Sequence, residues 1–188
     1  MLVFADFIFL VECKGVEYSA HIATKNSMKS DNSSRKISTG LDQLCSTASL
    51  IRKGVFNQLI GDCQNKKIIS SVITYKQIYL SNSKWYFENN IAPHIKTKEN
   101  ELNELFELRP QVLSVIELEL LLKYSIECDK NYFEIFNERL TKGDHFLQGD
   151  WYNQLNVKNK KINSLLTSFS NFTDEMLSDL RGFDNGKM

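Results

Sequence analysis

The N-terminal segment is the feature that most restricts the fold. Residues 2–13 read LVFADFIFLVEC, an almost unbroken run of β-branched and aromatic residues with no helical period. A strand that is apolar on both faces is typical of the centre of a sheet covered on both sides. We therefore expect residues 2–13 to form a buried strand, or a tight hairpin, in the middle of the domain.

The next segments predict a helix and a second strand. Residues 15–37 are rich in Ser, Asn and Lys and predict a loop. Residues 40–53 carry apolar residues at helical spacing, with Thr39 as the expected cap and Gly54 at the expected end. Residues 67–75, KIISSVITY, predict the second strand. Strand, helix and strand in this order are typical of a right-handed crossover in an α/β core.

The second half of the chain predicts mainly helices. A leucine-rich helix is expected to stop at Pro110, and residues 111–115 predict a short strand. Ser114 and Glu117 have the spacing of a capping box ahead of IELELLLKY. Further helices are expected to begin at Asp129 or Asn131, and at Thr173.

These elements predict an α/β (α+β) fold, a small mixed sheet with a crossover helix and a mostly helical C-terminal region. We expect a core of residues 1–82 and a helical accessory region of residues 83–188. With 42% hydrophobic and 24% charged residues the composition is that of a soluble globular protein. No apolar stretch reaches the roughly 18 residues that a membrane span needs, so we expect a cytoplasmic protein without membrane contact.

Charge and cysteine usage narrow the function classes. The 23 basic and 23 acidic residues cancel, so any nucleic-acid contact requires a local basic patch. The cysteines have no zinc-ligand spacing, and we expect reduced thiols, with two disulfides as the alternative. They are Cys13, Cys45, Cys63 and Cys128.

The end of the first strand carries the residues suited to chemistry. Glu12 and Lys14 are two residues apart and therefore share one face of a strand, with Cys13 on the other. The carboxylate, with the Cys13 carbonyl, suits Mg²⁺, and an ammonium beside it can orient a water or stabilise developing charge. This pair fits phosphodiester hydrolysis. The alternative is a solvated ion pair of little energetic value.

Asp6 is the candidate for a second carboxylate. It shares the parity of Glu12, but a regular strand would separate the two by roughly 20 Å. One ion can bind both residues only if the chain turns between them. The alternative interpretation is that Asp6 is a turn residue.

Three segments together resemble a known group of enzymes. The strand FIFLVECKG, the helix LDQLCSTASLI and the strand KIISSVITY are similar to the PD-(D/E)xK nuclease superfamily, which has the restriction-endonuclease-like fold. The resemblance covers residues 1–80. It implies that Glu12 and Lys14 match the family's catalytic Glu and Lys, that Gln43 matches a helix Gln of some branches, and that Mg²⁺ (or Mn²⁺) is the cofactor.

The chain departs from the family at its start. The family core places a helix and a strand before the metal-binding Asp, and there is no room for both before residue 12. Either Asp6 is that Asp in a shortened hairpin, or the Asp lies upstream of Met1 and the chain is a truncated or decayed copy.

Two functions follow as expectations. The first is a Mg²⁺-dependent nuclease-like protein that hydrolyses DNA, or an inactive copy of one; the second is a non-catalytic binding or assembly module with the same fold. Basic residues of the loop after the first strand are candidates for phosphate contacts, with a solvated loop as the alternative. These residues are Lys25, Lys29, Arg35 and Lys36.

Overall fold

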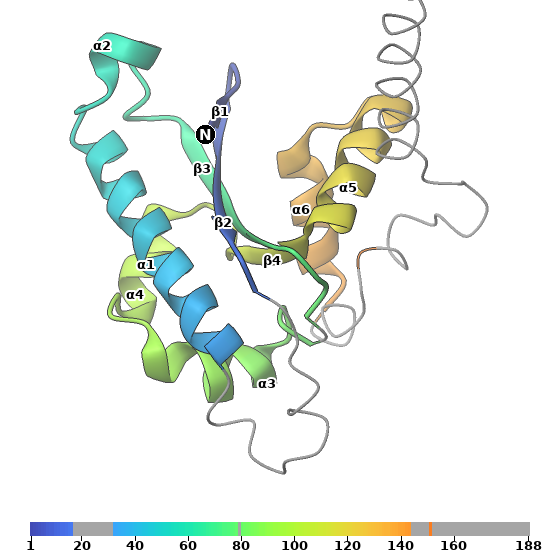
Figure 1. Cartoon of the computed structure of the whole chain (residues 1–188). Helices are drawn as coiled ribbons and strands as arrows, with labels where there is room; N and C mark the ends of the chain where they lie inside the picture. The colour runs from blue at the N-terminus through green and yellow to red at the C-terminus, as the bar shows by residue number, and fades with distance from the viewer. Residues whose placement is uncertain (17–31, 79, 144–150, 152–188) are drawn as a thin grey trace, which may run out of the picture. The chain divides into compact units, whose positions relative to one another are not determined.

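The computed structural model describes residues 1–16, 32–78, 80–143 and 151 (Figure 1). By its contacts the chain divides into two units, Met1–Asn156 and Val157–Met188. All described residues belong to the first unit. The helix expected at Thr173 lies outside them.

A four-stranded mixed sheet forms the centre of this unit. Its strands are β1 (Leu2–Val3), β2 (Phe7–Lys14), β3 (Lys67–Thr74) and β4 (Gln111–Ser114), in the order β1-β2-β3-β4. β1 runs antiparallel to β2, whereas the pairs β2–β3 and β3–β4 are parallel. The hairpin form of residues 2–13 and the two later strands are therefore confirmed. β4 belongs to the same sheet as β2 and β3, although its residues fall in the predicted accessory region.

Helix α1 (Asn32–Arg52) covers one face of the sheet. Its buried residues, among them Leu41 and Leu44, pack in one core with Ile8 and Leu10 of β2. β2 joins β3 through this helix in a parallel crossover, as the sequence predicts. Close packing of the helix on the sheet buries a continuous apolar layer, which is the main source of stability at this face.

The predicted start of this helix is wrong by two turns. Asn32 to Lys36 are helical, and Thr39 is an interior residue whose hydroxyl donates to the Arg35 carbonyl at 2.9 Å. Serines in this part favour loops in a sequence because they bond to nearby backbone. Here tertiary contacts decide otherwise: Ser38 is buried and also donates to the carbonyl of Ile91 at 2.9 Å.

A group of short helices packs beside α1 (Figure 1). The carboxylate of Asp42, in the middle of α1, accepts hydrogen bonds from the backbone N–H groups of Lys96 and Thr97 and from the Thr97 hydroxyl. This contact fixes the rotation of α1 about its own axis. The segments are α3 (Lys84–Tyr86), η2 (Phe87–Ile91), η3 (Ala92–His94) and α4 (Glu99–Leu105), whereas α2 (Asn57–Ile60) lies beyond the C-terminal end of α1.

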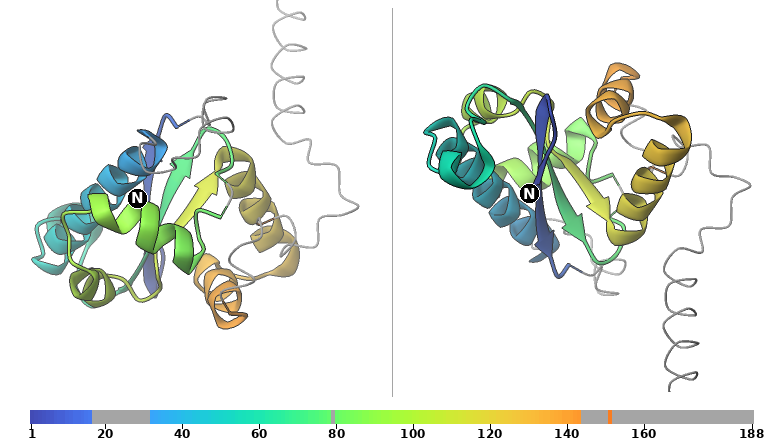
Figure 2. Two further views of the ribbon diagram at one scale, coloured as in Figure 1. Left: turned by 90° about the horizontal axis from the view of Figure 1, so that it is seen from below. Right: turned by 90° about the horizontal axis from the view of Figure 1, so that it is seen from above.

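Helices α5 (Val115–Cys128) and α6 (Tyr132–Thr141) lie on the opposite face of the sheet (Figure 2). The ring of Phe9 in β2 lies 5.5 Å from that of Tyr132 and 5.6 Å from that of Phe136. Trp151 is fully buried against Phe136. β2 is thus covered on both faces, which its unbroken apolar sequence predicts.

Both helices begin at capping boxes. Ser114 and Glu117 exchange the reciprocal hydrogen bonds at the start of α5, and Asn131 and Glu134 do so for α6. The first capping box was predicted from the sequence, and of the two predicted starting points for the second helix, Asp129 and Asn131, the structure selects Asn131. Together the elements confirm a mixed α/β fold with a mostly helical part after β4.

All four cysteines are free thiols, so the disulfide alternative does not hold. Within the described part of the chain, no helix combines the length and apolarity that a membrane crossing requires.

Candidate functional site

Glu12 and Lys14 lie near the C-terminal end of β2, on the face that α1 covers. They share the parity of Ile8 and Leu10, which belong to the core under α1. The Nζ atom of Lys14 donates to Oε1 of Glu12 at 2.8 Å. The side chains are 17% (Lys14) and 30% (Glu12) exposed. The pair therefore lies at the rim of the core, partly screened from water and open on one side.

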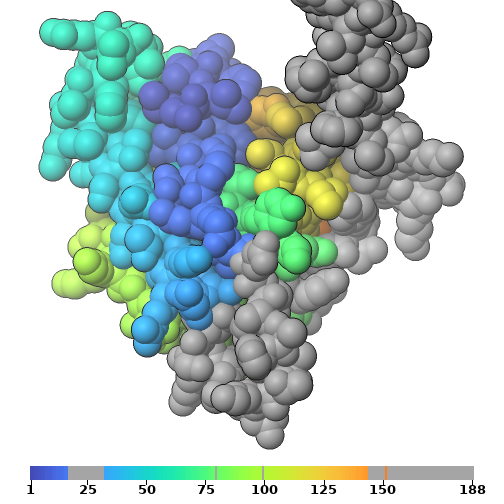
Figure 3. All heavy atoms as spheres, viewed as in Figure 1, coloured from blue at the N-terminus to red at the C-terminus, as the bar shows by residue number. Residues whose placement is uncertain are grey.

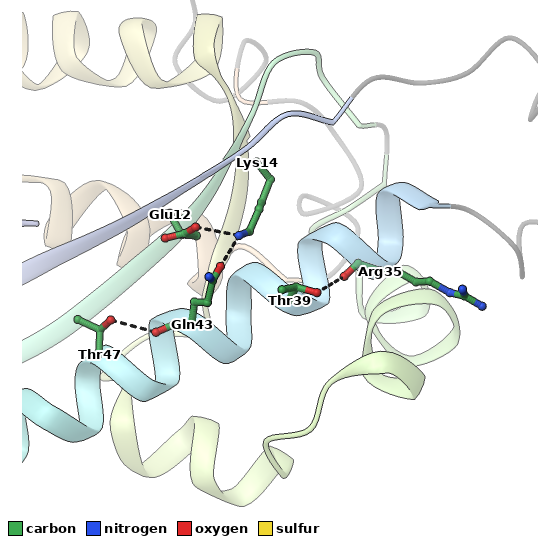
Figure 4. Close-up of polar contacts among 6 residues, drawn as sticks. All are labelled: Glu12, Lys14, Arg35, Thr39, Gln43 and Thr47. Carbon is green, nitrogen blue, oxygen red and sulfur yellow. Dashed lines mark hydrogen bonds and ion pairs between the residues drawn. The ribbon is translucent and has the colours of Figure 1, made fainter.

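Gln43 completes a polar cluster with this pair. Lys14 Nζ also donates to Oε1 of Gln43, so the ammonium lies between a carboxylate and an amide oxygen (Figure 4). The backbone carbonyl of Gln43 accepts from the Thr47 hydroxyl at 3.0 Å. Glu12 and Lys14 thus lie next to a residue that follows them by about 30 positions in the chain. We call Glu12, Lys14 and Gln43 the Glu–Lys–Gln cluster.

Asp6 does not join this cluster. It lies in the turn between β1 and β2, and its backbone carbonyl accepts from the N–H of Lys67 at 3.4 Å. The chain does turn near residue 6, but β2 then runs without a break from Phe7 to Lys14. Glu12 follows Asp6 by six positions, and the extended chain between them separates the two residues by roughly 20 Å. The expectation that Asp6 shares a metal ion with Glu12 is therefore wrong for this structure.

The structure describes two of the four predicted phosphate-binding residues. Lys25 and Lys29 lie outside the described residues. Arg35 and Lys36 are exposed on the second turn of α1 and not in a loop, which corrects that expectation. Lys36 Nζ donates to the carbonyl of Gly15 at 2.9 Å, whereas Arg35 extends away from the Glu–Lys–Gln cluster (Figure 4).

The site lies at the junction of β2 and α1. The atoms of the N-terminal hairpin and of α1 adjoin on one face of the molecule (Figure 3). At this junction Gly40 of α1 approaches Lys14 and Val72, a contact that sequence reasoning missed. No signal in the sequence indicated it, because the predicted helix begins at Gly40, and only the observed start at Asn32 places this glycine in the helix interior.

The donor set limits how a metal can bind. Among the residues that the structure describes, no group of three or more His, Cys, Asp or Glu side chains can hold an ion. Glu12 is the carboxylate of the cluster, and the Cys13 side chain is exposed on the other face. Mg²⁺ binds through one or two carboxylates, waters and substrate phosphates, so this donor set fits Mg²⁺ together with substrate and not a closed protein cage.

Cys45, a buried residue of α1, has a strongly shifted pKa. Burial raises the pKa of this thiol from 9.0 to about 11, and the charges of Asp42 and Glu101 act in the same direction, against a hydrogen bond with Thr97. Because the thiolate is disfavoured, this cysteine is a packing residue of α1 and a poor nucleophile at neutral pH.

The shift of Cys45 predicts a loss of stability at alkaline pH. Since the folded-state pKa is the higher one, the stabilisation is fully present below pH 9 and is lost as the pH rises through about 11. We expect a decrease of at most about 2–3 kcal/mol in the free energy of unfolding. Urea titrations of the wild type and Cys45→Ala between pH 8 and 11 measure it. Parallel pH profiles for the two proteins would contradict this assignment.

Fold and site together define a mixed α/β protein with the Glu–Lys–Gln cluster at the end of its central strand. Comparison with known proteins returned no matching family model, no matching curated protein and no matching solved structure.

Proposed function

We propose that this chain is a nuclease-like hydrolase that acts on phosphodiester bonds of DNA with Mg²⁺ or Mn²⁺. The observation that supports the proposal best is the Glu–Lys–Gln cluster, in which residues of β2 and α1 converge on one ammonium group. The resemblance of residues 1–80 to the PD-(D/E)xK nucleases supports the same function, since Glu12, Lys14 and Gln43 are the positions that it singles out.

Each residue has a role that its position permits. The Lys14 ammonium is a donor that can hold the attacking water or stabilise charge developing on the phosphate. Gln43 and Glu12 hold that ammonium in place. Glu12 and the Cys13 carbonyl would hold the divalent ion, which supplies Lewis-acid activation of phosphate and water when bound. Arg35 and Lys36 are available for phosphate contacts at the start of α1.

The test is cleavage of supercoiled plasmid and single-stranded DNA with Mg²⁺ or Mn²⁺. We expect Glu12→Gln and Lys14→Met each to reduce the cleavage rate by about 10²-fold or more. A matched control exists in the exposed ion pair of Lys67 and Glu107, whose charged atoms are 3.8 Å apart. Glu107→Gln and Lys67→Met should cleave like the wild type. Cleavage that survives both cluster substitutions would remove the cluster from the mechanism.

A second candidate is a non-catalytic DNA-binding module of the same fold. Two observations favour it: the cluster has a single carboxylate for a metal ion, and that carboxylate is already hydrogen-bonded to Lys14. This function predicts no cleavage and no Mg²⁺ binding by calorimetry. It also predicts DNA binding that weakens steeply with salt and decreases in Arg35→Ala and Lys36→Ala.

A further inference from the structure

We infer that Gly40 is a positioning residue for Lys14. It provides the gap in α1 through which the lysine side chain reaches between Glu12 and Gln43. The inference rests on the proposed function in one respect, which is that this function gives Lys14 a catalytic role. The geometry itself concerns how the fold holds one ammonium group.

The gap is defined by three distances. A Cβ atom placed on Gly40 would lie 3.2 Å from Cε of Lys14, and 3.2 and 3.3 Å from the two methyl carbons of Val72. Such contacts are tighter than ordinary van der Waals packing. A methyl group at position 40 would therefore require the side chain of Lys14 or of Val72 to shift by a few tenths of an ångström.

The backbone conformation does not explain this glycine. Gly40 lies inside the regular helix α1, and the positive-φ glycines of the described chain are Gly54, Gly61 and Gly143. A glycine in a helix interior is less favourable than alanine. The structural reason for a glycine at position 40 is thus the close approach of Lys14 and Val72 and not a turn.

The neighbours differ in how far they can yield. Val72 is fully buried in β3, which pairs with β2 on one side and β4 on the other. Lys14 is the flexible neighbour, and its Cε is bonded directly to the Nζ atom that contacts Glu12 and Gln43. An added methyl group at position 40 should therefore displace the ammonium before it displaces the strand.

The experiment measures the reactivity of Lys14 toward an acylating reagent, read residue by residue by mass spectrometry. The exposed Lys53 and Lys98 in the same sample serve as internal references. We expect Gly40→Ala to raise Lys14 labelling at least about threefold, because the ammonium loses charge-assisted hydrogen bonds. In an active protein, the cleavage rate should fall by about tenfold through misplacement of Lys14.

Val72→Ala separates positioning of Lys14 from simple packing. It removes both methyl carbons that the new Cβ would meet and leaves the conflict with Lys14. If Gly40 positions Lys14, Val72→Ala alone labels like the wild type and the double variant stays raised. If Gly40 serves only the contact of α1 with β3, the double variant returns to wild-type labelling, which overturns the inference.

Circular dichroism and thermal unfolding establish that each variant is folded before labelling. Wild-type labelling in folded Gly40→Ala would equally overturn the inference. Labelling can be measured without DNA cleavage, so the two proposals are tested separately. If the wild type does not cleave DNA but Gly40→Ala still raises Lys14 labelling, the proposed catalysis is refuted and the positioning role is supported.

Discussion

Replacing Phe9 by alanine is expected to lower the free energy of unfolding by about 3–5 kcal/mol. Phe9 is fully buried in β2, and its ring contacts Tyr132 and Phe136 across the sheet–helix interface. The substitution removes apolar contacts to α6 and leaves a cavity at the centre of that face, which the surrounding helices fill only in part. Urea unfolding followed by circular dichroism measures the loss.

Two controls make the Phe9 result specific. Leu2 is the register partner of Phe9 in β1 but is 45% exposed, so Leu2→Ala should cost less than about 1 kcal/mol. Phe9→Leu keeps most of the buried volume and should lie between the two. Equal destabilisation by Leu2→Ala and Phe9→Ala would mean that β2 is not the centre of the packed sheet.

Glu117→Ala is the second substitution with a large expected effect, a loss of about 3 kcal/mol of folding free energy. This carboxylate is only 4% exposed. It accepts hydrogen bonds from the backbone N–H of Ser114 at 2.8 Å, the Ser114 hydroxyl at 2.9 Å, the Gln77 amide at 3.3 Å and the Trp151 N–H at 3.2 Å. Alanine would leave these buried donors without an acceptor.

The second capping box of the chain is the matched control. Glu134 makes the same local bond to the backbone of its cap residue Asn131, but it is exposed to solvent. Glu134→Ala should therefore cost only the local cap, about 1 kcal/mol. Thermal and urea unfolding of both variants measure the difference. If the two substitutions cost the same, the buried bonds of Glu117 to Gln77 and Trp151 contribute nothing.

Much of the fold follows from short-range signals in the sequence. The period-free apolar run of β2 predicts a strand covered on both faces, because a side chain of either parity must then be buried. The capping box of Ser114 and Glu117 predicts where α5 begins, because both partners of each bond lie within one helical turn. These signals need no knowledge of the rest of the chain.

The candidate site was predictable only in part. Strand parity places Glu12 and Lys14 on one face, and the structure has them hydrogen-bonded there. Parity also places Asp6 on that face, but parity carries no information on distance, and a continuous β2 separates the two carboxylates. The contact of Gln43 with Lys14 depends on the rotation of α1, which the bonds of Asp42 to Lys96 and Thr97 fix from the other side.

The sequence by itself thus determined the central strand, the order of crossover helix and strands, and the cap of α5, since each is set by neighbours along the chain. Tertiary structure decided the early start of α1, where Ser38 is buried and its hydroxyl donates to the carbonyl of Ile91, far along the chain. It also decided the gap at Gly40 and the meeting of Glu12, Lys14 and Gln43. Both features depend on how closely α1 packs on the sheet. That distance is determined jointly by residues that lie far apart in the sequence.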